Sequence, residues 1–228
     1  MSSKEDIQFM NHILWNKEVY NYVIHLKRLD IKEGDENANK LINTLELFAF
    51  GDYSHFLSYQ NYYIVLDSVL LIKLIRLTIL SAAMQEGSSI QIDKLLTEYK
   101  LGQAIEHYIE ITGENISKDL IFEKICIDMV DDSIIDIKFN DIENTVVIGK
   151  TNVIRDSFDN NTTALRILKE KEISGKNLAN ALINLQEWFE KSLDPTKTGI
   201  DAQIDNMNKR QMKDINLRKR KPSDNCSL

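Results

Sequence analysis

Apolar residues recur at three- and four-residue steps along most of the chain, a spacing that places them on one face of a helix. In the first segment, Ile7, Met10, Ile13 and Leu14 follow this spacing. Polar clusters and glycines separate the segments, as Gly51 does after residue 50. The pattern predicts helices over residues 4–29, 38–50, 64–84, 94–99, 103–111 and 118–130, and a further helix from about residue 178.

The segment 64–84 is apolar around nearly its whole circumference. A helix of this kind must be buried on several sides. Asp67, Lys73 and Arg76 interrupt its apolar stretch, whereas a membrane span needs about 20 mostly apolar residues without such charges. We therefore expect a core helix.

Strand patterns occupy a small part of the chain. Ile90 and Ile92 alternate with a polar residue, and the run from Ile135 to Phe139 alternates in the same way. A polar loop over 140–144 separates this run from the β-rich residues 145–148, which predicts a hairpin. The order helix, strand, helix, helix, strand, strand over 64–150 is that of a winged helix. We expect Asp93 and Ser117 to cap the helices that follow them.

The last third of the chain is more polar. Residues 157–177 are rich in Asn, Thr and Lys and predict an exposed insertion, and Pro195 interrupts or restarts the final helix. The expected fold class is mainly α, with a small antiparallel sheet. The expected parts are an N-terminal helical segment (1–63), a winged-helix part (64–156), the insertion or linker (157–177), C-terminal helices (178–215) and a basic, disordered tail (216–228).

Composition and charge narrow the class of protein. The chain has 228 residues, of which two are proline and two are cysteine, so neither a turn-rich sandwich nor a disulfide framework is expected. The net charge is −7, but residues 208–221 carry seven basic residues and one acidic residue, which leaves −13 for the rest. An acidic body argues against a body that binds phosphate.

The basic tail has two readings that the residues leave open. It resembles a split nuclear-localisation signal, and it can equally be a solvated charge run. In the first reading, the signal residues are Lys209, Arg210, Arg218, Lys219, Arg220 and Lys221.

Residue patterns for catalysis or cofactor binding are absent from the sequence. The four histidines stand apart, without the His-x-His or His-Glu-x-x-His spacing of a zinc hydrolase, and no glycine-rich phosphate loop occurs. We expect no catalytic residue, metal or cofactor. The helix over 118–130, which would read DNA in a winged helix, is net acidic, and the 140–144 loop has no base. Nucleic-acid binding is therefore a minor alternative.

Several short segments resemble one family when taken in order. Residues 45–54 read Leu-Glu-Leu-Phe-Ala-Phe-Gly-Asp-Tyr-Ser, and Lys73-Leu74 is followed by Leu77-Thr78. Arg155-Asp156 follows the hairpin, residues 185–188 read Leu-Gln-Glu-Trp, and Gly199-Ile200 comes later. Together they are similar to the COP9 signalosome subunit 7 family over about 40–210. Departures are Ile75 in place of an arginine and extra residues near 101–116 and 157–172.

The resemblance implies a PCI domain, which is a stack of helical pairs ending in a winged helix. It implies a non-catalytic scaffold subunit, found in nucleus and cytoplasm, within a complex that removes a ubiquitin-like modifier from cullins. Its partners would be other PCI subunits and the zinc isopeptidase that carries the chemistry. A PCI subunit of the proteasome lid or of translation initiation factor three is the alternative with the same architecture.

Two regions are candidate partner-binding sites. A sheet edge exposes backbone groups that can pair with another chain, and an isolated C-terminal helix must bury its apolar face. The first region is the sheet segment 134–149. The second is the apolar stripe from Leu185 to Met207, and this stripe can instead pack within the chain. The candidate residues are Ile134, Ile135, Asp136, Ile137, Val146, Val147, Ile148, Leu185, Trp188, Ile200, Ile204 and Met207.

Overall fold

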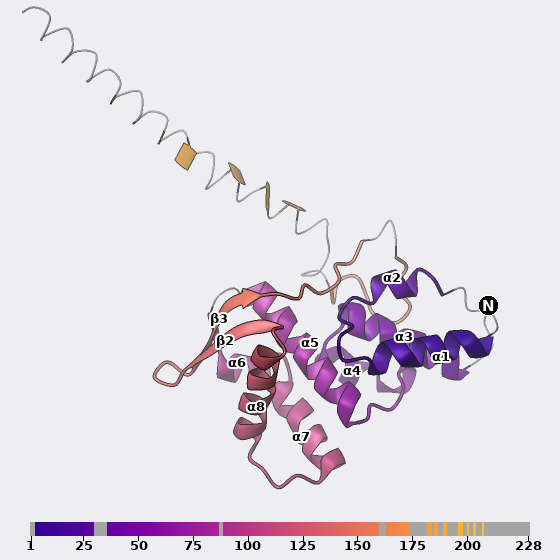
Figure 1. Ribbon diagram of the computed structural model, residues 1–228. Coiled ribbons are helices and arrows are strands. Elements are labelled where there is room, and N and C mark those ends of the chain that lie inside the picture. The colour runs from indigo at the N-terminus through magenta and orange to yellow at the C-terminus, as the bar shows by residue number, and fades with distance from the viewer. Residues whose placement is uncertain are drawn as a thin grey trace, which may run out of the picture. The chain divides into compact units, whose positions relative to one another are not determined.

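The computed structural model of the chain describes residues 3–29, 36–86, 89–159 and 163–173, and single positions between 182 and 207. The chain divides into two units, Met1–Leu178 and Ala179–Leu228. The described residues are mainly helical, with a small three-stranded antiparallel sheet, as the sequence predicted at this level (Figure 1).

The first unit begins with five helices and one short 3-10 turn. They are α1 (Ser3–Trp15), α2 (Val23–Leu26), α3 (Glu36–Phe50), α4 (Tyr53–Ser58), η1 (Gln60–Tyr62) and α5 (Ser68–Glu86). The single helix expected over 4–29 is wrong, because α1 ends at Trp15 and the chain turns before Val23. The side chains of Lys73 and Asp156, both distant in sequence, bind the backbone on either side of this break.

Helix α5 is the centre of the unit. Leu70, Leu74, Leu77 and Leu80 are all fully buried. Among the described residues, α5 is the one helix long and apolar enough to cross a bilayer, and 67% of its apolar window is buried within the fold. The core helix of a soluble protein has these properties, so the expected core helix is confirmed.

The next elements are one strand, three helices and two strands. The helices expected over 94–99, 103–111 and 118–130 all form, which is one helix more than the expected order has between its strands. The elements are β1 (Ser89–Gln91), α6 (Ile92–Thr97), α7 (Leu101–Thr112), α8 (Lys118–Asp131), β2 (Ile135–Asn140) and β3 (Thr145–Thr151). Ser117 caps α8, as predicted, by accepting the N–H of Leu120. Asp93 is not a cap, because it lies inside the first turn of α6.

The predicted hairpin is confirmed. In the antiparallel β2–β3 pair, Ile137 lies opposite Ile148 and Asn140 lies opposite Thr145. The sheet order is β1-β3-β2, so β3 is the central strand. Helix α8 packs against β2, and the rings of Phe122 and Phe139 meet edge to face.

The segment after the sheet is packed onto the helices. We call residues 155–159 and 163–173 the strap. Its Phe158, Leu168 and Ile173 are 4%, 3% and 1% exposed, and Phe158 packs edge to face on Phe50. Residues 157–177 were expected to be an exposed insertion. In the described part of this range the polar residues from Lys169 to Glu172 are exposed, but these three apolar residues pack into the core.

Candidate functional site

In the first candidate interface, 134–149, most of the predicted residues do not reach the surface. Ile134, Ile135, Ile137, Val146 and Ile148 are buried in the core. Of the predicted residues in this region, Asp136 is exposed and Val147 is half-buried.

The position of β3 also limits what its backbone can do. Residues 145–147 pair with β1 on one side and with β2 on the other. The expectation that Val146 and Val147 offer a free edge is therefore wrong, because the central strand has already used its hydrogen-bonding groups there. Among the described residues, no strand pairs with the outer edge of β2, so that edge can still accept a strand.

The second candidate interface has apolar side chains on the surface of the second unit. Leu185, Ile200 and Met207 are helical and 60%, 51% and 62% exposed. Leu182, Ile183 and Phe189 are also at least half exposed. Trp188, Ile204 and the signal residues from Lys209 to Lys221 lie outside the described residues.

Residues that carry the family resemblance meet inside the first unit, and Arg155 is their centre. Its side chain enters the core, where Nη2 donates to the carbonyls of Phe48 (2.6 Å) and Ala49 (3.2 Å). Nη1 donates to the carbonyls of Gly51 (2.8 Å) and Leu77 (3.2 Å) and to Ser81 Oγ. Burial lowers the pKa of Arg155 to about 10. The guanidinium thus satisfies carbonyls at the C-terminal end of α3, which have no helical partner of their own.

Gly51 brings the chain close enough for this contact. A Cβ at this position would lie 2.5 Å from Leu47 Cδ1 and 2.8 Å from the Leu47 carbonyl oxygen. Any side chain here would push the turn away from α3. This close approach explains the glycine in the Phe-Ala-Phe-Gly segment.

Lys73 binds the end of α1. Its ammonium donates to the carbonyls of Leu14 (2.8 Å), Asn16 (2.6 Å) and Ile13 (3.4 Å). It also lies 5.2 Å from the centre of the Tyr22 ring. Burial lowers the pKa of Lys73, and the three carbonyl oxygens oppose that shift because they solvate the ammonium. The lysine therefore fixes the point where the chain leaves α1.

Two carboxylates, the buried Glu46 and the half-buried Asp156, accept backbone N–H groups from distant segments. Glu46, 2% exposed, accepts the backbone N–H groups of Arg166 (2.6 Å), Ile167 (2.9 Å) and Leu168 (2.9 Å). Asp156 Oδ2 accepts the N–H of Val23 (3.2 Å) and that of the preceding residue (2.5 Å). Burial raises the pKa of Asp156. These contacts join the strap to α3 and to the start of α2.

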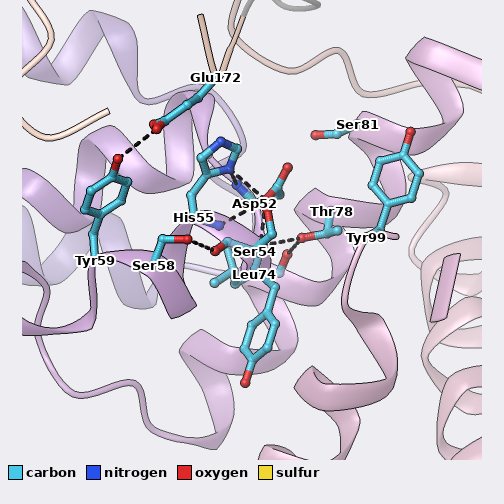
Figure 2. Close-up of polar contacts among 12 residues, drawn as sticks. Asp52, Ser54, His55, Ser58, Tyr59, Leu74, Thr78, Ser81, Tyr99 and Glu172 are labelled. Carbon is cyan, nitrogen blue, oxygen red and sulfur yellow. Dashed lines mark hydrogen bonds and ion pairs between the residues drawn. The ribbon is translucent and has the colours of Figure 1, made fainter. Parts of the chain in front are cut away.

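A second polar cluster surrounds the start of α4 (Figure 2). Asp52 Oδ1 accepts the N–H groups of Ser54 (3.0 Å) and His55 (3.3 Å), and His55 Nδ1 lies 2.7 Å from the same oxygen. The Ser54 hydroxyl donates to Asp52 at 2.6 Å. Asp, His and Ser also make up hydrolase triads, but there the serine hydroxyl bonds to the imidazole. This cluster is a capping box that starts a helix.

The same cluster connects α4 to α5. The N–H of Tyr53 donates to Thr78 Oγ1 at 3.2 Å, and Thr78 donates to the Leu74 carbonyl at 2.8 Å. Figure 2 shows these contacts beside Asp52. At the left of the same view, the Tyr59 hydroxyl donates to Glu172 of the strap at 2.8 Å. The polar residues here position helices.

One cavity of about 590 Å³ opens between the N-terminal segment, α5, α7 and α8. Tyr20 and Tyr108 line it, together with Asp131 and the ion pair of Arg76 with Asp132 at 2.7 Å. Within the described ranges, no group of three or more His, Cys, Asp or Glu side chains could hold a metal ion.

Sequence reasoning did not find the roles of Glu46 and Asp156. A signal for the first was present, because Glu46 interrupts an otherwise apolar run, as Lys73 does in α5. A charge inside a buried helix needs a partner. Its partners lie about 120 residues away, so spacing along the chain cannot identify them.

Comparison of the chain with protein-family models and with curated proteins finds no match in either.

Proposed function

We propose that this protein is a non-catalytic scaffold subunit of a COP9 signalosome, with a PCI domain like that of the subunit 7 family. The observation that carries the proposal is the set of buried polar contacts. Glu46, Gly51, Lys73, Thr78 and Arg155 belong to the segments that resemble the family, and each makes a contact that the fold depends on. Residues constrained in this way support a shared fold more strongly than a likeness among surface residues would.

The arrangement of elements supports the same proposal. Helices α1 to α5 precede β1, and the order β1-β3-β2 with α6 to α8 between β1 and β2 suits a winged helix. A PCI domain has helical pairs in the first position and a winged helix in the second.

In this proposal the protein contributes surfaces and not chemistry. The outer edge of β2 would pair with a neighbouring PCI subunit, and the exposed apolar positions of the second unit would enter a shared helical bundle. A zinc isopeptidase in the same complex would remove the modifier from cullins. The complex would act in nucleus and cytoplasm, with the basic tail as the import signal.

The decisive experiment is a tagged purification from native cells at physiological salt, with every co-purifying protein identified. Recovery of a zinc isopeptidase together with other PCI proteins supports the proposal. Recovery of proteasomal or ribosomal proteins would replace the complex with the lid or initiation factor three while keeping the architecture. Recovery of nucleic acid alone would overturn the scaffold role.

A further inference from the structure

Helix α8 carries apolar side chains on two faces. Its inner face packs against α5, α7 and β2, and buries Ile121, Phe122, Ile125, Cys126 and Met129. Its outer face exposes Leu120 (57%), Ile127 (55%) and Val130 (37%). The inner face accounts for the helix's place in the core, whereas the outer apolar residues make no contribution there.

These outer residues form a stripe along the helix axis. Leu120 and Ile127 are seven residues apart, which places them on one line of the helix, and Asp131 continues that line. The exposed Glu123 and Lys124 lie on the turn between Leu120 and Ile127. From Leu120 to Val130 the stripe is about 15 Å long, the length of ten residues of α-helix. A stripe of this length and direction is suited to a second helix lying along it.

The charges around the stripe select the partner. Asp119, Glu123 and Asp131 are exposed beside it, against two exposed bases, Lys118 and Lys124. Lys118 is already paired with Glu106. Because the C-terminal end of a helix carries partial negative charge, the potential near Asp131 is negative as well.

The cavity of about 590 Å³ lies at that end of the stripe and is lined by Asp131, Tyr20 and Tyr108. Three cations, Lys17, Lys73 and Arg76, also line it, and the ammonium of Lys73 is already bound to backbone carbonyls. Arg76 forms an ion pair with Asp132 at 2.7 Å and lies 3.9 Å from the carboxylate of Asp128. Asp131 has no ion-pair partner among the described residues, so it can accept an incoming cation beside the two tyrosine rings.

We propose that the outer face of α8 binds a basic amphipathic helix of a partner protein. The apolar side of that helix covers Leu120, Ile127 and Val130, and its lysines or arginines face the acidic residues, with one of them at Asp131. The proposal does not depend on which complex contains the protein. It also gives a use to a face that would repel the phosphates of DNA.

The test uses the full-length protein and a labelled synthetic peptide of about 18 leucine and lysine residues, with leucines at helical spacing. Binding is measured by fluorescence anisotropy at about 150 mM salt, where weak surface attractions are screened. Wild-type protein is expected to bind. Leu120→Ser with Ile127→Ser is expected to weaken binding by about tenfold or more, while the thermal transition is kept because both positions are exposed.

Matched controls separate this face from other exposed apolar residues. Val65→Ser with Ile154→Ser, at positions 92% and 66% exposed, and Leu182→Ser with Leu185→Ser should leave the affinity unchanged. Glu123→Lys with Asp131→Lys should weaken binding of the leucine–lysine peptide. The same variant should bind a peptide in which glutamate replaces each lysine. Equal binding by the Leu120/Ile127 variant, or an equal loss in either control, would overturn the proposal. So would a wild-type dimer that this variant disperses, because a second copy would then be the occupant.

Discussion

Arg155 shows how a charged side chain becomes part of a core. The cost of taking a guanidinium out of water is offset only when its donors find acceptors inside. Here four carbonyls and one hydroxyl accept from Nη1 and Nη2, and two of the carbonyls belong to the last turn of α3. The Nε of Arg155 is buried without a hydrogen-bond partner. The sequence marks Arg155 only as a residue after a hairpin, and the acceptors come from segments about 75 to 105 residues earlier.

Arg155→Met is expected to lower the free energy of unfolding by about 3 kcal/mol or more, because it leaves several buried carbonyls without donors. Urea unfolding measures this loss. Arg166→Met is the control, since that arginine is itself exposed and its side chain donates to Asn43 and Asn39, so its loss should cost about 1 kcal/mol. Equal losses in the two variants would show that the core contacts of Arg155 contribute no more to the free energy of unfolding than the surface contacts of Arg166.

The buried Cys126 predicts a dependence of stability on pH. Burial raises the pKa of its thiol to about 12, whereas an unfolded thiol titrates near about 8.5. Between these values the folded protein holds a proton that the unfolded chain loses, so stability falls as pH rises above about 9.

Cys126→Ala should lessen this fall, although the smaller side chain lowers stability at every pH. The measurement is urea unfolding from about pH 8 to pH 10, with Cys226→Ser in both proteins. The expected difference in slope is at most about 1.4 kcal/mol per pH unit. Parallel curves would contradict the assignment.

At the scale of elements, local patterns predicted what local forces decide. The buried helix α5, the β2–β3 hairpin and the Ser117 cap all follow from periodicity, strand alternation and capping chemistry. The break after Trp15 and the packed strap did not follow. Both depend on groups far along the chain, Lys73 and Asp156 for the break and Glu46 for the strap.

Lys73→Met should loosen α1, because the carbonyls at the end of that helix lose their shared donor. We expect a loss of about 1–3 kcal/mol and faster amide hydrogen exchange in α1 than in α5. Lys94→Met, which removes an exposed ion pair with Glu86, should cost much less stability than Lys73→Met. Unchanged exchange in α1 would mean that its other contacts are sufficient.

Glu46→Leu should release the strap, because a leucine of similar size cannot accept the three N–H groups of residues 166–168. Tryptic cleavage after Lys169 and Lys171 should become roughly tenfold faster. Glu172→Ala, which removes the more exposed bond to Tyr59, is the comparison and should have a smaller effect. Cleavage at the wild-type rate in Glu46→Leu would rule out this anchoring role.

At the scale of the molecule, the two units differ in what they do with apolar side chains. The first unit buries most residues of α3 and α5, whereas the described apolar residues of the second unit are at least half exposed. Helical spacing predicted an apolar face in the second unit and left open whether that face packs within the chain. It could not predict that β3 would be the central strand, because strand order depends on where the short β1 pairs.

Ile200→Asp with Ile204→Asp should block entry into a complex and leave the monomer folded. Ile200 is half exposed, so a carboxylate there meets water in the free protein and an apolar surface in a helical bundle. Co-purification from cells reports complex entry, and the thermal transition reports the fold. Loss of that transition would show that these residues belong to the protein's own core.

The strap has a consequence for the order of synthesis. The carbonyls at the end of α3 and the carboxylate of Glu46 leave the ribosome early, and their partners, from Arg155 to Leu168, leave more than 100 residues later. Until then the nascent helices hold buried polar groups without partners, so they cannot settle as a separate folding unit. A chain cut at residue 150 should therefore remain unfolded and pass to chaperones or proteases, and only a chain extended through the strap should become resistant.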